Sequence, residues 1–460
     1  MKITLIFPAR DNDIARGMVS IPPAGITRLA ALVPDDAEVK LVDMLSYDRV
    51  DYEEPADLVG ITVRTPVASV AYEIADRFRA RGVPVVLGGP HASAVPLDAA
   101  RHADTVVVGE AETTWPRFLE DFRIGGAKRF YVCGPLKFDP GMESLHHEPA
   151  FPALTNAPIP KNGLLPRRRY IMDSILTTRG CPFDCSFCPV SILFGKKPRH
   201  RPVDEVVREV AGMKKRVYFN LDDNIFGIPG DEEYYLDLFK ALAGLKKKKY
   251  WAGQAGLGVV DTEKGREILR RAVKSGLTLV SVGIESVSRE GLIESDAARK
   301  MSNKGNKTPS VDTILEQIRA LKEHGLFILG WFVIGWDSDR EDQYQSTLEF
   351  ADRAGIAPII VNLYPMPGTR CYDDFLQAGR IKPGLDWEDF SLAGNNIVYH
   401  HPALSEAAMV TGARSAMQSA YSFTRMFKRA VDYTRHRPSP ISFPLAMILQ
   451  YRGKKNFPTD

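Results

Sequence analysis

Short apolar segments alternate with amphipathic helical segments along most of the chain, and this alternation restricts the possible folds more than any other feature. A strand buried on both faces of a parallel sheet reads as a short apolar run, and a helix joins each strand to the next. Helical spacing of apolar residues falls at 26–32, 69–81, 97–101 and 114–122. The predicted strands between these helices are 3–7, 39–42, 58–62, 83–87 and 105–108. We therefore predict a doubly wound, Rossmann-like α/β domain over residues 1–125.

The alternation resumes at Tyr170 and continues through six strand-and-helix units. The predicted helices include 203–213, 234–245, 264–274 and 311–324. The predicted strands are 173–178, 216–221, 250–254, 277–284, 327–334 and 358–363. Six parallel units make an incomplete barrel, so we predict a partial (β/α)6 barrel, open on one side, over residues 169–399.

Two segments lack the alternation. Seven prolines interrupt residues 126–168, which we predict to be an extended linker. The three arginines at 167–169 are interpreted as a solvated surface run, with contact to a cofactor phosphate as the alternative. Residues 400–460 are predicted to form a helical region, periodic over 404–427. Its basic tail, 435–455, is expected to dock on the fold, and contact with a membrane surface or a lipid substrate is the alternative.

The composition excludes several classes of protein. The chain has 460 residues, 44% hydrophobic and 25% charged, which excludes wholesale disorder. A net charge of +3 gives no argument for nucleic-acid binding. Five cysteines, three of them in one loop, make no disulfide framework, and free thiols indicate a reducing cytoplasm. The first residues do not read as a signal peptide, and no apolar run approaches the roughly 20 residues of a membrane span.

Three cysteines, Cys181, Cys185 and Cys188, follow an apolar β-prone run at 174–178. Clustered thiolates are metal ligands, and three of them leave a coordination position open for a reactive centre. Iron–sulfur clusters are held in this way. The alternatives are structural zinc with His200 as fourth ligand, or reduced thiols without metal. Two further cysteines, at 133 and 371, stand alone and are predicted to be buried small hydrophobes.

Three loops follow predicted strands of the N-terminal domain, at 64–67, 88–93 and 109–112. Open parallel sheets bind ligands at the carboxyl ends of their strands. Gly88 and Gly89 permit close approach of a ligand to the backbone. No G-x-G-x-x-G follows the first strand, which argues against a dinucleotide. The loops therefore predict a different ligand, and ordinary tight turns are the alternative.

The cysteine loop resembles that of the radical S-adenosylmethionine (SAM) superfamily. The segment 22–26, the Gly-Gly-Pro-His loop at 88–91 and the Val-Gly-Glu at 108–110 resemble the cobalamin-binding domain of that superfamily's cobalamin-dependent branch. The resemblance implies three cofactors: a [4Fe–4S] cluster on Cys181, Cys185 and Cys188, SAM on its open iron, and cobalamin.

The resemblance also implies further cofactor-binding residues. In the barrel these are Phe187, Asp222, Asp223, Gln254 and Glu285. In the N-terminal domain they are Thr65, Pro66, Val67, Gly88, Gly89, Pro90, His91, Gly109 and Glu110. Helix capping is the alternative for the three barrel acids.

Histidine ligation of cobalt is a separate question. The chain lacks the Asp-x-His-x-x-Gly triplet through which some cobalamin proteins ligate cobalt. His91 is therefore not assigned to cobalt, and the group on the lower face of the cobalamin stays open.

The resemblance implies an enzyme, most simply a methyltransferase that acts on an unactivated carbon or phosphorus through a 5′-deoxyadenosyl radical and methylcobalamin. A cyclase or ring-rearranging enzyme of the same family is one alternative, and a non-catalytic cobalamin or iron–sulfur sensor is another. The expected partners are a small-molecule or lipid-like substrate and an electron donor such as flavodoxin or ferredoxin. The sequence assigns no catalytic residue and no substrate.

Overall fold

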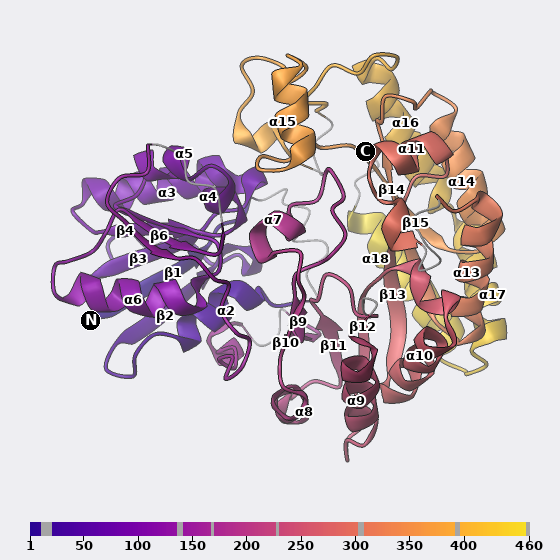
Figure 1. The fold of residues 1–460 in the computed structure, drawn as a ribbon, viewed down its shortest axis with the longest axis horizontal. Helices are drawn as coiled ribbons and strands as arrows, with labels where there is room; N and C mark the ends of the chain where they lie inside the picture. The colour runs from indigo at the N-terminus through magenta and orange to yellow at the C-terminus, as the bar shows by residue number, and fades with distance from the viewer. Residues whose placement is uncertain are drawn as a thin grey trace.

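A computed structural model describes residues 1–10, 21–135, 141–166, 170–226, 230–301, 308–391 and 396–456. The arginine run at 167–169 lies outside these residues. Two parallel sheets, each with helices packed on it, stand side by side (Figure 1). The described residues contain no helix that is long and apolar enough to cross a membrane.

The N-terminal sheet is parallel throughout, with strand order β2-β1-β3-β4-β5-β6-β7. Its strands are β1 (Lys2–Phe7), β2 (Glu38–Asp43), β3 (Leu58–Thr62), β4 (Val85–Gly88), β5 (Thr105–Val108), β6 (Phe130–Cys133) and β7 (Leu145–Glu148). The order reverses between β1 and β3, which is where doubly wound sheets open a ligand crevice. The predicted α/β class is confirmed.

Helices cover both faces of this sheet (Figure 1). One face packs on α2 (Ala24–Ala31) and α6 (Ala111–Arg123). The other packs on α3 (Ala68–Ala80), α4 (Pro90–Ala94) and α5 (Pro96–Arg101). Because both faces are buried, the central strands are apolar at nearly every position, which is the signal that predicted them.

Two strands lie inside the predicted linker, 126–168. Strand β6 pairs with β5, and β7 pairs with β6, so the N-terminal sheet continues to Glu148. All four residues of β6 are buried, yet the prolines around it hid the strand from the sequence. Strand β7 reads Leu-His-His-Glu and lies at the sheet edge, where no apolar run is required. Extended chain without a strand begins only after Glu148.

The second sheet is also parallel, with order β15-β14-β13-β12-β11-β8. Its strands are β8 (Asp173–Ile175), β11 (Val217–Asn220), β12 (Tyr250–Ala255), β13 (Leu277–Glu285), β14 (Phe327–Ile334) and β15 (Ala357–Asn362). The helices on its outer face are α8 (Val203–Gly212), α9 (Glu232–Ala243), α10 (Glu263–Ser275), α13 (Val311–Glu323) and α14 (Gln343–Ala354). Among the described residues β8 and β15 do not pair, so the predicted partial barrel is confirmed.

Strand β8 is shorter than the predicted 173–178. The chain leaves the barrel sheet after Ile175, and β9 (Thr178–Arg179) pairs antiparallel with β10 (Arg199–His200) instead. This separate hairpin carries the chain directly into the cysteine loop.

Alternate residues of the barrel strands face opposite sides of the sheet. On β13, Val280 and Val282 pack with the surrounding helices, while Leu279 and Ser281 face the concave side. Leu279 belongs to an apolar lower layer, and Ser281 lies above it, toward the carboxyl ends of the strands. The concave side is therefore apolar at its base and polar at its mouth.

Three C-terminal helices complete the fold: α16 (Glu406–Ala420), α17 (Phe423–His436) and α18 (Ser442–Asn456). The predicted periodic segment 404–427 is divided at Tyr421 and Ser422 into two helices. Ala430, Tyr433 and Ala446 pack against the apolar lower layer of the barrel. The basic tail thus docks on the fold by one of its faces, as predicted.

Candidate functional site

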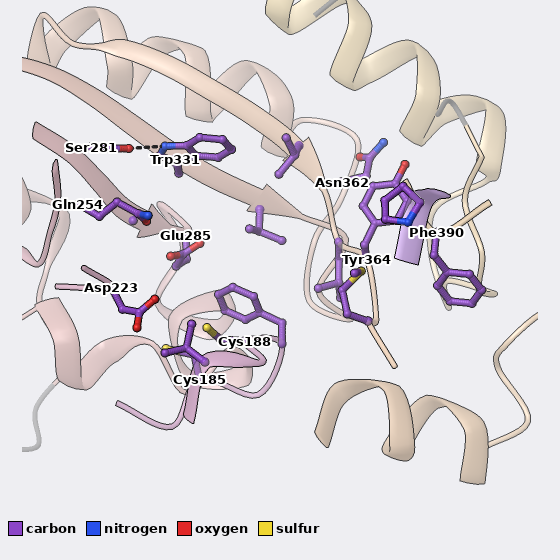
Figure 2. Close-up of a pocket in the computed structure, with 18 of the residues that line it drawn as sticks. Cys185, Cys188, Asp223, Gln254, Ser281, Glu285, Trp331, Asn362, Tyr364 and Phe390 are labelled. Carbon is purple, nitrogen blue, oxygen red and sulfur yellow. Dashed lines mark hydrogen bonds between the residues drawn. The ribbon is translucent and has the colours of Figure 1, made fainter. Parts of the chain in front are cut away.

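A cavity of about 1020 Å³ lies where the carboxyl ends of the barrel strands meet the N-terminal domain. Cys181, Cys185 and Cys188 all line it. In Figure 2, Cys185 and Cys188 share the space with Asp223, Gln254 and Glu285, and Tyr364 and Phe390 stand at the other end. Pro66 and Val67 of the N-terminal domain also line this cavity, so residues from both halves of the chain face it.

The cysteine loop has a close-packed backbone. Gly180 has φ +92°, and a β-carbon there would lie 2.9 Å from the carbonyl oxygens of Gly195 and Lys197. Cys181 N donates to the carbonyl oxygen of Gly195 at 3.1 Å, so the segment that follows holds the loop from behind. Glycine is required at 180 because of both its φ angle and this close approach.

The thiols of this loop are buried, so they stay protonated unless a metal binds them. Burial raises the pKa of Cys181 to about 11 and that of Cys188 to about 12, so without metal both stay protonated at neutral pH. A metal centre removes the proton from a coordinating thiol outright. No three cysteine, histidine or acidic residues of the described chain are grouped to hold a single ion. A cluster binds each thiolate through a different iron, so it does not need the three thiols to meet at one ion.

The zinc alternative required His200 as a fourth ligand. Its Nε2 lies 3.2 Å from Asp231 Oδ2, and its ring stacks on Tyr234 with centroids 4.3 Å apart. His200 does not line the cavity of the cysteines. The other two cysteines, Cys133 and Cys371, are buried outside that cavity.

Glu285 ends β13 with φ +67°, a strained backbone angle for a residue with a side chain. Its carboxylate accepts a hydrogen bond from Lys300 Nζ at the edge of the cavity. Burial lowers the pKa of Lys300, but Glu285 and the charges of Cys185 and Cys188 together outweigh burial and raise it. Lys300 was not predicted, because the sequence places it in a short polar stretch, α12 (Ala298–Met301), that reads as surface.

The two neighbouring acids Asp222 and Asp223 have different surroundings. Asp222 is fully buried and accepts from the backbone N–H groups of Thr177 at 2.6 Å and Thr178 at 2.9 Å. It holds the chain between β8 and β9 and does not line the cavity. Asp223 does line it, and burial, reinforced by the charge of Asp222, raises the pKa of Asp223 to about 7.

The N-terminal residues divide between two cavities. Pro66 and Val67 line the large cavity, together with Arg64 of the same predicted loop and with Arg10, which was not predicted. A second cavity of about 290 Å³ lies at the carboxyl ends of β3, β4 and β5. Four predicted residues line this second cavity: Gly88, Gly89, Gly109 and Glu110.

Gly89 has φ +97°, and a β-carbon there would approach Val63 O at 3.0 Å. The close approach that requires glycine at this position is therefore to the chain's own backbone.

Thr65, Pro90 and His91 line neither cavity. His91 is fully buried, its Nδ1 lies 3.1 Å from Thr65 Oγ1, and its ring meets Trp387 edge-on at 4.8 Å. Burial lowers the pKa of His91 to about 4, so the imidazole is neutral. These contacts give Thr65 and His91 a packing role, consistent with leaving His91 unassigned to cobalt.

A buried ion-pair cluster joins the two halves of the chain. Arg179, two residues before Cys181, donates to Glu110 at 2.5 Å and to Glu112. Arg199 also donates to Glu110, through Nη1 at 3.2 Å and through Nη2. Glu110 therefore ties the N-terminal sheet to the hairpin that carries the cysteine loop.

Comparison with known proteins identifies both halves. The Radical SAM superfamily matches residues 175–368, and the B12 binding domain matches residues 17–119. Bacteriochlorophyllide d C-8(2)-methyltransferase of Chlorobaculum tepidum is 30% identical over 376 residues, covering 79% of this chain and 78% of the relative. Hopanoid C-2 methylase of Rhodopseudomonas palustris is 26% identical over 385 residues, covering 82% of this chain and 67% of the relative.

The fold is similar to that of OxsB, a cobalamin-dependent S-adenosylmethionine radical enzyme solved with aqua-cobalamin bound. The TM-score is 0.72 at 14% identity, over 99% of this chain and 71% of OxsB. The chain therefore belongs to the cobalamin-dependent radical SAM enzymes, whose cofactors are a [4Fe–4S] cluster, SAM and cobalamin.

Proposed function

We propose that the protein transfers a methyl group to an unactivated carbon of a largely apolar small molecule. One observation carries the proposal: the three cysteines and the N-terminal loop residues Pro66 and Val67 line the same cavity of about 1020 Å³. An enzyme that combines a cluster with cobalamin has to bring both to one substrate, and this cavity gives them a common space.

Residue roles follow from position. Cys181, Cys185 and Cys188 would hold the cluster, and Gln254 and Glu285, at the ends of β12 and β13, would bind SAM. The glycine-lined cavity at 88, 89 and 109 and the residues at 66 and 67 would hold cobalamin. When bound, these groups supply one-electron reduction, homolytic bond cleavage and carriage of a methyl group.

The chain's own residues position the reactants and keep water out. Trp331 Nε1 donates to Ser281 Oγ at 2.6 Å, which fixes the indole on the concave side of the sheet (Figure 2). Phe187 packs edge-on against Trp336 with centroids 5.7 Å apart. Apolar walls of this kind exclude solvent, which would otherwise compete for reactive species.

The substrate class follows from the far end of the cavity. Val333, Val361, Leu363, Met366 and Phe390 line the cavity, and polar residues, among them Asn362, Glu388 and Asn396, line it with them. The relatives are named for a bacteriochlorophyllide and a hopanoid, and both compound classes are ring systems with large apolar surfaces. A substrate of similar chemistry would fill this end, and a one-electron donor such as flavodoxin or ferredoxin would supply the electron.

The test is anaerobic turnover of the reconstituted enzyme with a reductant, SAM bearing a deuterated methyl group, and tetrapyrrole or triterpenoid acceptors. We expect a product heavier by one labelled methyl group, detected by mass spectrometry. A rearranged product without added mass would favour the cyclase alternative. Absence of SAM cleavage in cluster-loaded protein would favour a sensor.

Replacing Glu285 by glutamine is expected to weaken SAM binding about tenfold or more while leaving the cluster in place. The change removes a buried charge and leaves Lys300 without its carboxylate partner, a loss on the order of 1–3 kcal/mol. Equilibrium SAM binding and iron content measure the two effects.

Glu290→Gln, an exposed acid of the next helix, is the matched control. Unchanged SAM affinity in Glu285→Gln would limit Glu285 to its ion pair with Lys300.

A further inference from the structure

The last two helices carry an unusual share of the positive charge. Residues 423–456 contain eight lysines and arginines and one acid, a net charge of +7, so the remainder of the chain carries −4 of the total of +3. The one acid, Asp432, lies 2.5 Å from Lys322 Nζ on another helix and is thereby neutralised. This segment is strongly cationic in a protein that is otherwise slightly acidic.

Several of these cations are free to meet a partner. Arg425 pairs with Asp352, and Arg429 is buried against Gln450. By contrast, Lys428, Arg435 and Lys454 are exposed, and none of the described residues forms an ion pair with them.

Large hydrophobic side chains are exposed on the same two helices. Of the sixteen such side chains exposed among the described residues, five lie between 423 and 451. They are Phe423 (70% exposed), Phe427 (45%), Ile441 (68%), Ile448 (53%) and Tyr451 (53%), and we call them, with the three exposed cations, the C-terminal face.

The apolar residues form a continuous stripe. Along the start and length of α18, exposed positions recur at Ile441, Pro444, Ile448, Tyr451 and Lys454, which is one side of a helix. On α17, Phe423 and Phe427 are one turn apart, with rings 6.1 Å apart. Phe427 also meets Phe443 of α18 at 5.3 Å, and this contact joins the two helices into one surface.

We propose that the C-terminal face docks on the surface of an anionic lipid bilayer. A helix with an apolar side and flanking cations lies in the membrane interface, with its apolar side among the acyl chains and its cations at the headgroups. A bare cationic patch would fit a nucleic acid, but exposed isoleucines and phenylalanines add nothing to phosphate contacts. A second copy fits poorly, because a two-fold contact would set this positive face against itself.

The position of α17 and α18 is also compatible with docking on a membrane. Both helices lie in the barrel half of the molecule (Figure 1). The buried side of α18 covers the apolar lower layer of the barrel, and its exposed side points away from that layer. Membrane attachment through this face does not depend on the methyl-transfer reaction.

The test is flotation of the full-length, cofactor-loaded protein with two kinds of vesicle: phosphatidylcholine alone, and equimolar phosphatidylcholine and phosphatidylglycerol. We expect binding to the anionic vesicles only, weakened by salt. Phe427→Ser with Ile448→Asn should reduce the bound fraction at least tenfold, as should Lys428→Glu with Lys454→Glu. Ile124→Asn, at the most exposed isoleucine of the N-terminal domain, is the matched control and should bind like the wild type.

Three results would overturn the proposal. The first is equal binding of the wild-type protein to both vesicles, or to neither. The second is a concentration-dependent dimer that Ile448→Asn dissociates, which would make the face a contact between copies. The third is salt-sensitive retention on single-stranded RNA or duplex DNA without vesicle binding. Retained cobalamin and iron content in each variant shows that lost binding is not lost folding.

Discussion

Replacing Cys181, Cys185 and Cys188 together by alanine is expected to remove the iron–sulfur cluster and all reductive cleavage of SAM. The three thiols line one cavity, whereas Cys133 and Cys371 lie outside it, so neither of these two can take their place. Iron and sulfide content, the visible absorbance of the cluster and formation of 5′-deoxyadenosine measure the loss.

The matched control replaces the two remaining cysteines, Cys133 and Cys371, by alanine. Both are buried away from the large cavity, so cluster content should be unchanged, with at most a small loss of stability from the emptied space. A triple variant that retained iron and sulfide would contradict the assignment of the loop.

The strands could be predicted where burial on both faces of a sheet gives a continuous run of apolar residues. Strand β14 was predicted at its observed bounds, 327–334, because alternate residues pack on the outer helices and the others face an interior that is apolar at its base. Strand β7 was missed because an edge strand with half-buried histidines needs no apolar run. Strand β8 was predicted too long because the end of the apolar run, β9, pairs with β10 instead of continuing in the barrel sheet. This pairing depends on residues some twenty positions later and does not show in the local sequence.

Part of the site could be predicted from the order of the strands along the chain. Strand ends converge in a parallel fold, which places Gln254 and Glu285 beside the cysteines. Position along the chain does not tell which way a side chain turns. Asp222 and Asp223 are adjacent, yet one binds backbone and the other faces the cavity.

His91 and Lys300 also show that position along the chain does not tell where a side chain lies. His91 was predicted at the site and lies outside it, whereas Lys300 was not predicted and lies at the site. His91 follows a strand end but turns into the core, where Thr65 and Trp387 contact it. Lys300 belongs to a short helix with no visible motif, and it lies at the cavity with its Nζ bound to Glu285. Both outcomes depend on packing between elements that are distant in sequence.

The second prediction with a large effect concerns the ion pairs between the two halves. Arg179→Met is expected to lower the free energy of unfolding by about 3–5 kcal/mol, because it leaves the largely buried Glu112 without its ion-pair partner and the buried Glu110 with Arg199 alone. Calorimetry should show a lower melting temperature. Because Arg179 links the barrel half to the N-terminal domain, its loss should also lower methyl transfer more than SAM cleavage.

The pH dependence of this contribution follows from Glu112. Burial raises the pKa of its carboxyl, but the charge and hydrogen bond of Arg179, with the charge of Arg28, together outweigh burial and hold the pKa below its ordinary value. A lowered folded-state pKa means that the stabilisation is present above the unfolded pKa, about 4.3, and is lost as pH falls through the folded value. Melting temperatures of the wild type and of Arg179→Met should therefore converge in acid.

Two further variants separate the ion pair from simple packing. Arg199→Met leaves Glu110 paired with Arg179, so its effect should be smaller than that of Arg179→Met. Combining Arg179→Met with Glu112→Gln removes the stranded charge, so the double variant should be more stable than the sum of the single effects predicts. Strict additivity would mean that Arg179 and Glu112 do not interact, and that Arg179 stabilises the junction through Glu110 or through packing.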